Sequence, residues 1–195
     1  MAVRTTMHAL VHRTRSLIAD TDPGTQVFSD QEVQDLLDVR RVFVRYALLN
    51  PQRTVAPGGV VTYQDYFSAT GFWEDDYQLV DRNYAPINNL VVPDTSDVIS
   101  GHWAFSLNQY PPVWILGKTY DVYGTAADLL EQWAAKLKLN YDFNVQQTKY
   151  TRSQQVKQLL ELANVYRQRS LPRHAAMMRD DSNPDYPMPG PVWGE

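Results

Sequence analysis

The segment YDVYGTAADLLEQWAAKLKL, Tyr120–Leu139, carries the clearest helical period in the sequence and decides the architecture. Its apolar side chains recur every three or four positions, as they do along the buried side of a helix. Acidic and basic side chains fall outside that line, which consists of Val122, Ala126, Leu129, Leu130, Trp133 and Leu137. The pattern predicts a core helix on which the other elements pack.

A second helix is predicted to begin at Ser29. Ser29 and Glu32 have the spacing of a capping box, and Phe28 can pack on Val33 as the accompanying hydrophobic staple. Apolar side chains continue at helical spacing, so we expect this helix to run to Asn50–Pro51, where the proline ends it. The later apolar side chains are Leu36, Leu37, Val39, Phe43, Val44, Tyr46 and Leu48.

Two more helices and a β-rich stretch complete the predicted organisation. Ala2–Ala19 has the spacing of an amphipathic helix, and a fourth helix is expected from Thr151 to Leu171. Between the second and third helices, prolines, glycines, tyrosines and short apolar runs replace the helical period. His102–Leu107 alternates like a strand buried on one face, whereas Val113–Leu116 is apolar throughout, like a strand covered on both sides.

The expected fold class is α+β: an antiparallel helical bundle of about four helices with an inserted β-rich subdomain and an extended C-terminal arm. The predicted parts are residues 1–54 and 118–171 for the bundle, 55–117 for the insert and 172–195 for the arm. The arm holds five of the twelve prolines, so a helix or central strand is not expected there.

Composition excludes several classes of protein. The 195 residues include no cysteine, which rules out disulfide scaffolds, thiolate zinc sites and cysteine nucleophiles. The formal net charge of −4 argues against wholesale nucleic-acid binding. No stretch approaches the ~18 apolar residues of a membrane span, and the N-terminus lacks the apolar run of a signal peptide. We therefore expect a soluble protein that is made in the cytoplasm.

Charge is distributed unevenly along the chain. Asp65–Asp97 contains seven acidic residues and one basic residue, whereas Lys149–Arg173 contains six basic residues and one acidic residue. Such asymmetry is compatible with docking between copies or between layers of an assembly, and also with ordinary solvated faces of both signs.

Two motifs that point to chemistry lack the required spacing. Gly117–Thr119 follows an apolar strand and precedes a helix, as a phosphate-binding loop does, but Pro112 occupies the position of the first glycine. A tight strand-to-helix turn is the expected structure there. His8 and His12 share one side of a predicted helix, but two histidines without a third ligand do not make a metal site.

Acidic and hydroxyl groups between the predicted strands were weighed as catalytic or metal-binding residues. Glu74–Asp76 and the pair Asp94 and Asp97 match no calcium loop, and solvated turns are the expected role of such clusters. Ser100–His102 brings a hydroxyl near an imidazole without the surrounding motif of a nucleophile. We expect no enzyme activity, no cofactor and no metal.

Arginines cluster at two places. Arg40, Arg41 and Arg45 are expected to project from the second helix. A second group crowds the end of the fourth helix, where cations complement the helix dipole and could equally contact phosphate groups. The second group consists of Arg167, Arg169 and Arg173.

Residues Gly117–Ala134, GKTYDVYGTAADLLEQWA, resemble the segment that leads into a long helix in head-tail connector proteins of long-tailed DNA bacteriophages. Tyr141–Phe143 and Tyr150–Gln155, with the helix that follows, are similar to the next part of these proteins. Phe28–Glu32 fits the N-terminal helices more loosely. Gly101–Trp103 lies in a stretch that resembles an elaboration of some members, and the likeness covers about half of the chain.

The resemblance implies a non-enzymatic virion protein of the head-tail neck, assembled from subunits in the host cytoplasm. Such an adaptor forms a ring, commonly of twelve copies, that docks beneath the portal protein and offers a platform to the next neck or stopper protein. DNA passes through the ring without sequence-specific binding, and no membrane is involved. Family members engage the portal through a terminal extension, so the arm and the basic helix end are the candidate contacts with portal or neighbouring subunits. These residues are Arg167, Arg169, Arg173, Met177, Met178, Tyr186 and Trp193.

Three alternative functions remain open from the sequence. The chain could be another neck or tail-completion protein, such as a stopper or terminator, which copy number in the particle would distinguish. It could be a small DNA-binding regulatory protein that uses the basic helices, and salt-dependent duplex binding would then be measurable. An enzyme is the third alternative, tested by a hydrolase screen with and without divalent metal.

Overall fold

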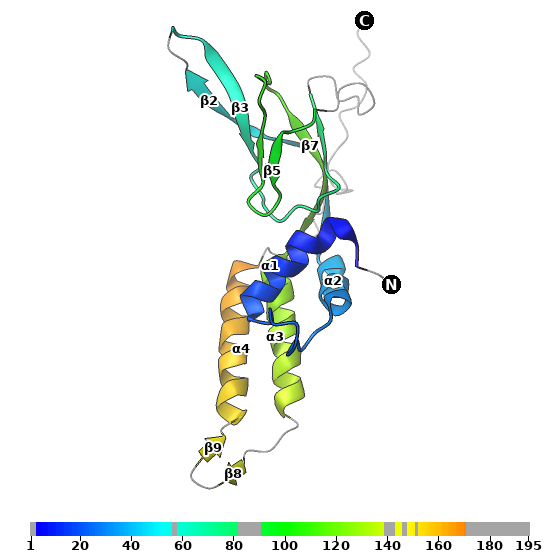
Figure 1. The fold of residues 1–195 in the computed structure, drawn as a ribbon, viewed down its shortest axis with the longest axis vertical. Helices are drawn as coiled ribbons and strands as arrows, with labels where there is room; N and C mark the ends of the chain where they lie inside the picture. The colour runs from blue at the N-terminus through cyan, green and yellow to red at the C-terminus, as the bar shows by residue number, and fades with distance from the viewer. Residues whose placement is uncertain are drawn as a thin grey trace, which may run out of the picture.

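The computed structural model describes residues 3–55, 58–81, 91–138, 143–145, 148–150 and 152–170. Figure 1 shows an elongated molecule with helices gathered in one half and two sheets in the other. The helical elements are a short 3₁₀ turn, Thr5–Met7, followed by α1 (His8–Ile18), α2 (Asp30–Val39), α3 (Val122–Lys138) and α4 (Arg152–Arg169). The strands are β1 (Arg41–Leu48), β2 (Asn50–Val55), β3 (Val61–Phe67), β4 (Gln78–Val80), β5 (Thr95–Asp97), β6 (His102–Ala104), β7 (Trp114–Tyr120), β8 (Phe143–Val145) and β9 (Thr148–Tyr150).

Helix α3 forms the centre of the helical half. α1 and α2 pack on it near its N-terminal end, and α4 runs antiparallel beside it, with the β8–β9 hairpin at the far end of the pair (Figure 1). Leu129, Leu130 and Ala126 are completely buried, as the helical period predicts. The Tyr166 hydroxyl of α4 donates a hydrogen bond of 2.9 Å to the Leu17 carbonyl, which ties α4 to α1 as well.

The β-rich half consists of two antiparallel sheets that share one core. Sheet A has the strand order β1-β7-β4, and sheet B has the order β2-β3-β6-β5. Ile115 from sheet A and Tyr66 and Trp103 from sheet B are fully buried in the same cluster. Trp73 connects the sheets, because it forms a bridge with Thr119 and its amide donates a 2.9 Å hydrogen bond to the Val98 carbonyl after β5.

The predicted second helix is correct at its start and wrong after Val39. The capping box is present, with the Ser29 amide bound to the Glu32 carboxylate at 2.6 Å and the Glu32 amide to the Ser29 hydroxyl at 3.2 Å. The chain then leaves the helix at Arg40 and forms strand β1, in which exposed and half-buried residues alternate. Alternating valines next to a phenylalanine suit a half-buried strand, and this period of two outweighs the coincidental helical spacing of Val44 and Leu48.

The expected bundle of about four helices with an inserted β-rich subdomain is therefore wrong. The chain is mixed α+β, and two sheets, with three and four strands, form a main part of the fold. β1 and β2 lie largely within residues 1–54, which were expected to be helical, and the arm of residues 172–195 lies outside the described residues. Gly117–Thr119 is also not a turn: it belongs to β7, which pairs with β1 on one side and β4 on the other.

The predicted third and fourth helices are confirmed, and the predicted strand His102–Leu107 is confirmed only for its first half, because β6 ends at Ala104. α3 matches the expected core helix within two residues at its N-terminus, and α4 begins one residue after Thr151. Val113–Leu116 was expected to be covered on both faces, and this prediction is wrong for one face: Val113 and Ile115 are fully buried, whereas Trp114 and Leu116 are half-buried. The first helix is shorter than expected, because its initial turn is 3₁₀ and His8 begins the α-helical part.

Gly124 tests how closely α3 packs on Arg40 at the end of α2. A Cβ atom at this position would lie 2.8 Å from Arg40 Cζ and would overlap Asp121 Oδ2 and Arg40 Nη1. We expect Gly124→Ala to lower the free energy of unfolding by roughly 3 kcal/mol, because the overlap displaces a buried ion pair. Urea denaturation measures the change. Gly24→Ala is the matched control, since its Cβ would make only an ordinary contact with Asp22 at 3.5 Å; equal stability of the two variants would contradict the packing.

Candidate functional site

A buried charged group at the junction of the two halves is Arg40, which caps the C-terminus of α2. Its Nη1 lies 3.2 Å from Asp121 Oδ2, and its Nε donates a 2.8 Å hydrogen bond to Asp128 Oδ2. The Ser170 hydroxyl also bonds to Asp121, and Arg167 Nη2 donates a 3.2 Å hydrogen bond to Asp128 Oδ1. The expectation that Arg40 projects from a helix is wrong, because these carboxylates hold it inside the protein.

A second polar cluster surrounds Glu74, whose side chain is 1% exposed. Glu74 accepts hydrogen bonds from the Tyr120 hydroxyl at 2.6 Å, the Thr6 hydroxyl at 2.8 Å and Arg4 Nε at 3.0 Å, and it pairs with Lys118 at 3.2 Å. The cluster joins the N-terminal segment to sheet A. The expected solvated turn is therefore wrong for Glu74, whereas Asp75 and Asp76 are exposed.

The surroundings of Glu74 oppose one another in their effect on its pKa. Burial alone would raise the pKa, because it disfavours the charged carboxylate. Hydrogen bonds from Tyr120, Thr6 and Lys118, with the charge of Arg4, outweigh burial and hold the pKa below its ordinary value. Burial and the neighbouring Glu74 carboxylate raise the pKa of the Tyr120 hydroxyl, which therefore stays protonated and donates to Glu74. The arrangement is a fixed anchor with no open coordination position.

The other residues weighed for catalysis are used locally. Asp97 accepts hydrogen bonds from the Ser100 amide and hydroxyl at 3.3 and 2.7 Å, so it closes a turn as expected. Ser100 does not bond to His102, whose Nε2 instead lies 2.9 Å from Asp65 Oδ1. His8 and His12 are exposed on α1, and the described part of the chain contains no group of three or more His, Cys, Asp or Glu side chains placed to hold a metal ion.

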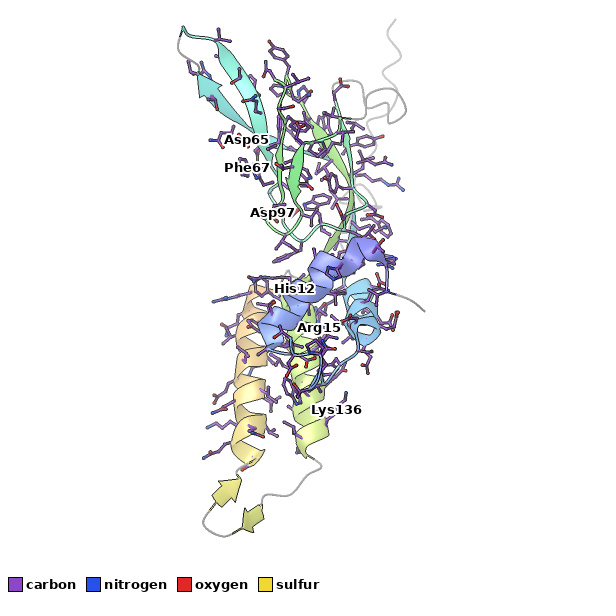
Figure 2. The ribbon with its side chains drawn as sticks, in the orientation of Figure 1. His12, Arg15, Asp65, Phe67, Asp97 and Lys136 are labelled. Carbon is purple, nitrogen blue, oxygen red and sulfur yellow. The ribbon has the colours of Figure 1, made fainter. Side chains whose placement is uncertain are left out.

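Arg15 lies in the last turn of α1 and has a structural role similar to that of Arg40. It is buried and donates 2.8 Å and 2.6 Å hydrogen bonds to the carboxylates of Asp20 and Asp30, respectively. A further bond of 2.6 Å reaches the Phe28 carbonyl, just before the capping box. Figure 2 shows Arg15 between α1 and the start of α2. These bonds position α2, and through it the strand that follows.

Sheet B presents an acidic and aromatic outer face, which we define as Asp65, Phe67, Asp97 and His102. The strand register pairs Phe67 and Asp97 with His102 on the face opposite to the buried Tyr66 and Trp103, and Asp65 lies two residues before Phe67 on the same face. The Phe67 and His102 rings are stacked, with centroids 4.6 Å apart. Figure 2 shows Asp65, Phe67 and Asp97 together on one side of the β-rich half.

Sheet A presents a basic and aromatic outer face, which we define as Arg41, Phe43, Arg45, Leu116 and Lys118. Phe43 is 63% exposed, and the Arg41 guanidinium lies 4.7 Å from the centre of its ring. Lys118 is paired with Glu74 and Asp76, whereas Arg45 is exposed and forms no ion pair with any described residue. A shallow hollow runs between Phe43, Arg45 and Leu116.

The strands β1 and β2 follow one another along the chain and are both edge strands. In the sheets of the described structure β1 pairs only with β7 and β2 only with β3, so each of these strands has one edge along which no described strand is paired. Every residue of β2 is exposed, and the β2–β3 hairpin projects from the body (Figure 1). Large apolar side chains recur along these two strands, namely Phe43, Leu48 and Val55, each at least half exposed.

The predicted partner-binding residues are only partly described. Arg167 binds the Glu131 carboxylate at 2.6 Å and is held against α3, whereas Arg169 is exposed on α4. The other five, Arg173, Met177, Met178, Tyr186 and Trp193, lie outside the described residues. Sequence reasoning missed both outer faces. The signal was present in the alternation RVFVR at 41–45, which places two arginines and one phenylalanine on one side of a strand.

Comparisons with protein-family models, with curated proteins and with solved structures find no match to this chain. Within the described helices, none has the length and apolar content needed to cross a bilayer. The candidate functional site is therefore defined by geometry: two outer sheet faces and the edge strands β1 and β2.

The Glu74 cluster gives the stability of the protein a specific pH dependence. Because the folded-state pKa of Glu74 lies below its ordinary value of 4.5, the ionised carboxylate stabilises the fold above that pH. The stabilisation is lost as the pH falls through the depressed pKa. We expect Glu74→Gln to lower the free energy of unfolding by about 3 kcal/mol at pH 7, and the difference from wild type to shrink below pH 4.5.

Urea denaturation at several pH values measures this difference. The control is Glu161→Gln, because Glu161 is exposed on α4 and its contact with Lys157 is long, at 3.8 Å. That variant should differ from wild type by no more than about 0.5 kcal/mol at any pH. A Glu74→Gln effect that is equally small, or independent of pH, would contradict the anchoring role of Glu74.

Proposed function

We propose that this chain is a structural subunit of a protein assembly, and specifically the head-tail adaptor of a long-tailed DNA bacteriophage. In this proposal, copies form a ring beneath the portal protein and offer a platform to the next neck protein. DNA passes through the ring without sequence-specific contacts. The subunits perform no chemical reaction.

The exposed edge of β1 and β2 is the observation that carries the proposal. An unpaired strand edge with exposed apolar side chains favours association with another chain, and monomeric proteins usually shorten or cover such edges. Here β1 and β2 are the edge strands of their sheets in the described structure, and Phe43, Leu48 and Val55 are exposed on them. A subunit that is surrounded by neighbours in its working state needs surfaces of this kind.

The residues that carry the family resemblance support the phage assignment. Gly117–Ala134 covers the end of β7 and most of α3, while the similar stretch from Tyr150 leads into α4. α3 and α4 pack side by side along their length, so the likeness falls on one continuous part of the molecule rather than on scattered segments. Arg169 lies exposed at the end of this pair, close to where the proposed arm begins.

The contacts of the arginines weaken the DNA-binding alternative. Arg40 and Arg167 are bound to carboxylates of α3, so neither is free to contact phosphate in the folded chain. An engaged guanidinium contributes little to the counterion release that drives non-specific DNA binding. Arg41 and Arg45 remain exposed on β1, and Arg169 remains exposed on α4.

The proposal predicts that the chain is a stoichiometric component of virions. Quantitative mass spectrometry of purified particles should find it at about the copy number of the portal protein, and native mass spectrometry of the isolated neck should find a ring. Its absence from virions would contradict the proposal. A copy number that differs from that of the portal would indicate another neck or tail-completion protein, such as a stopper or terminator.

The arm gives a second test of the portal contact. A chain that ends at Ser170 should retain the melting temperature of the full chain but lose at least tenfold in affinity for the portal protein, because the proposed anchors Met177, Tyr186 and Trp193 are removed. The full chain with Arg169→Glu should bind more weakly at low salt, since that side chain is exposed. Unchanged binding by the truncated chain would remove the arm from the interface.

A further inference from the structure

The outer faces of the two sheets differ in the sign of their charge, and each carries an exposed phenylalanine. We propose that a second copy of this chain docks head to tail, with the outer face of sheet A in one copy against the outer face of sheet B in the next. This inference rests on the proposed function only for the premise that copies assemble. It goes further by assigning the contact surfaces and the symmetry of the contact.

The two faces point in opposite directions. Successive side chains of a strand alternate between the two sides of a sheet, so the neighbours of a buried residue point outward. In sheet A the inward residue Ile115 separates Trp114 from Leu116, and in sheet B the inward residue Tyr66 separates Asp65 from Phe67. Ile115 and Tyr66 share one core, and therefore the two outer faces lie on opposite sides of the β-rich half.

The faces carry opposite charge. Arg45 on sheet A has no ion pair among the described residues, and Arg41 has only a 3.9 Å contact with Asp38. On sheet B, His102 is the sole basic side chain near Asp65 among the ion pairs of described residues, and Asp97 is exposed. Opposite potentials across an interface steer association and fix its register.

The same charges argue against a two-fold contact. In a two-fold dimer each face meets its own copy, which would bring Arg41 and Arg45 against the same arginines of the partner. Sheet B would likewise place Asp65 and Asp97 against carboxylates. A head-to-tail contact instead joins unlike faces, and a repeated contact of this type closes into a ring when the rotation between copies permits.

Each face also has an exposed aromatic centre. Phe43 is 63% exposed beside a shallow hollow, and Phe67 is 39% exposed and stacked on His102. Specific interfaces combine a central apolar or aromatic cluster with a polar rim. Here the phenylalanines supply the centre and the arginines and aspartates supply the rim on each side.

The absence of cysteine from the chain allows a direct test by site-specific cross-linking. Gln78→Cys places one thiol on the sheet A side, because Gln78 pairs with Leu116, and Thr95→Cys places one on the sheet B side with Asp97. Both positions are exposed and lie beside the proposed centres. The purified full-length variants are treated with a short bismaleimide, and the products are separated on a denaturing gel.

A head-to-tail contact predicts a distinctive set of products. The double variant should give a ladder of cross-linked species, each single variant should give only monomer, and co-expressed single variants should give dimers. Dimers from a single variant alone would show a two-fold contact and overturn the proposal. Monomers from the double variant at all protein concentrations would overturn it as well.

Charge reversal provides the matched comparison. Arg45→Glu in the double variant should reduce the cross-linked fraction at least tenfold, whereas Lys138→Glu at the exposed end of α3 should leave the ladder unchanged. Circular dichroism confirms that each variant is folded. Equal ladders from the two variants would exclude the sheet A face.

The outcomes separate this inference from the proposed function. If virions contain the chain as a ring but the cross-linking pattern fails, the docking faces are wrong and the adaptor proposal stands. If the pattern succeeds but virions lack the chain, the head-to-tail contact stands and the phage assignment is wrong.

Discussion

The buried guanidinium of Arg40 holds together the chain segments that connect the two halves of the molecule. Arg40 caps α2 and immediately precedes β1. It binds Asp121, which directly precedes α3, and Asp128, which lies within α3. Its carbonyl also accepts a 3.4 Å hydrogen bond from the Asp121 amide, so the contact joins positions 81 residues apart. A buried charge is costly without its partner. This requirement fixes where α2 ends, and it aligns β1 antiparallel to β7, starting with the pair Arg41 and Tyr120.

The alignment of β1 with β7 determines which side chains lie on the outer face of sheet A. Once Arg41 is opposite Tyr120, a period of two places Phe43 on the outer side of sheet A and Val44 on the inner side. Arg45 lies where the register shifts after Val44, and it is exposed and lines the same hollow as Phe43. A slip of one residue would exchange the two sets and bury the arginines. The Glu74 cluster secures the neighbouring end of β7 from the N-terminal segment. The buried ion pairs therefore act on function indirectly, by holding the faces that a second copy would contact.

Local signals in the sequence predicted local structure. Features that depend on contacts between residues distant in sequence could not be predicted. Ser29 and Glu32 fixed a helix start because a capping box is read within four residues, and α3 followed from its own apolar period. The segment 40–48 contained both a helical spacing and an alternation of two, and the choice between them depended on Arg40 meeting Asp121 far along the chain. Glu74 could not be distinguished from Asp75 and Asp76 for the same reason, since its partners Thr6 and Tyr120 are distant in sequence. The outer faces became recognisable only when the strands were in register.

In the proposed assembly the chain is a subunit whose exposed sheet surfaces are covered by identical neighbours. A cryo-EM reconstruction of the intact particle neck tests this claim most directly, because it places every copy and its contacts at once. The account predicts a ring of this chain below the portal in which Phe43 of each copy faces Phe67 of the adjacent one. A neck without this chain, or a ring in which both sheet faces remain in solvent, would contradict it.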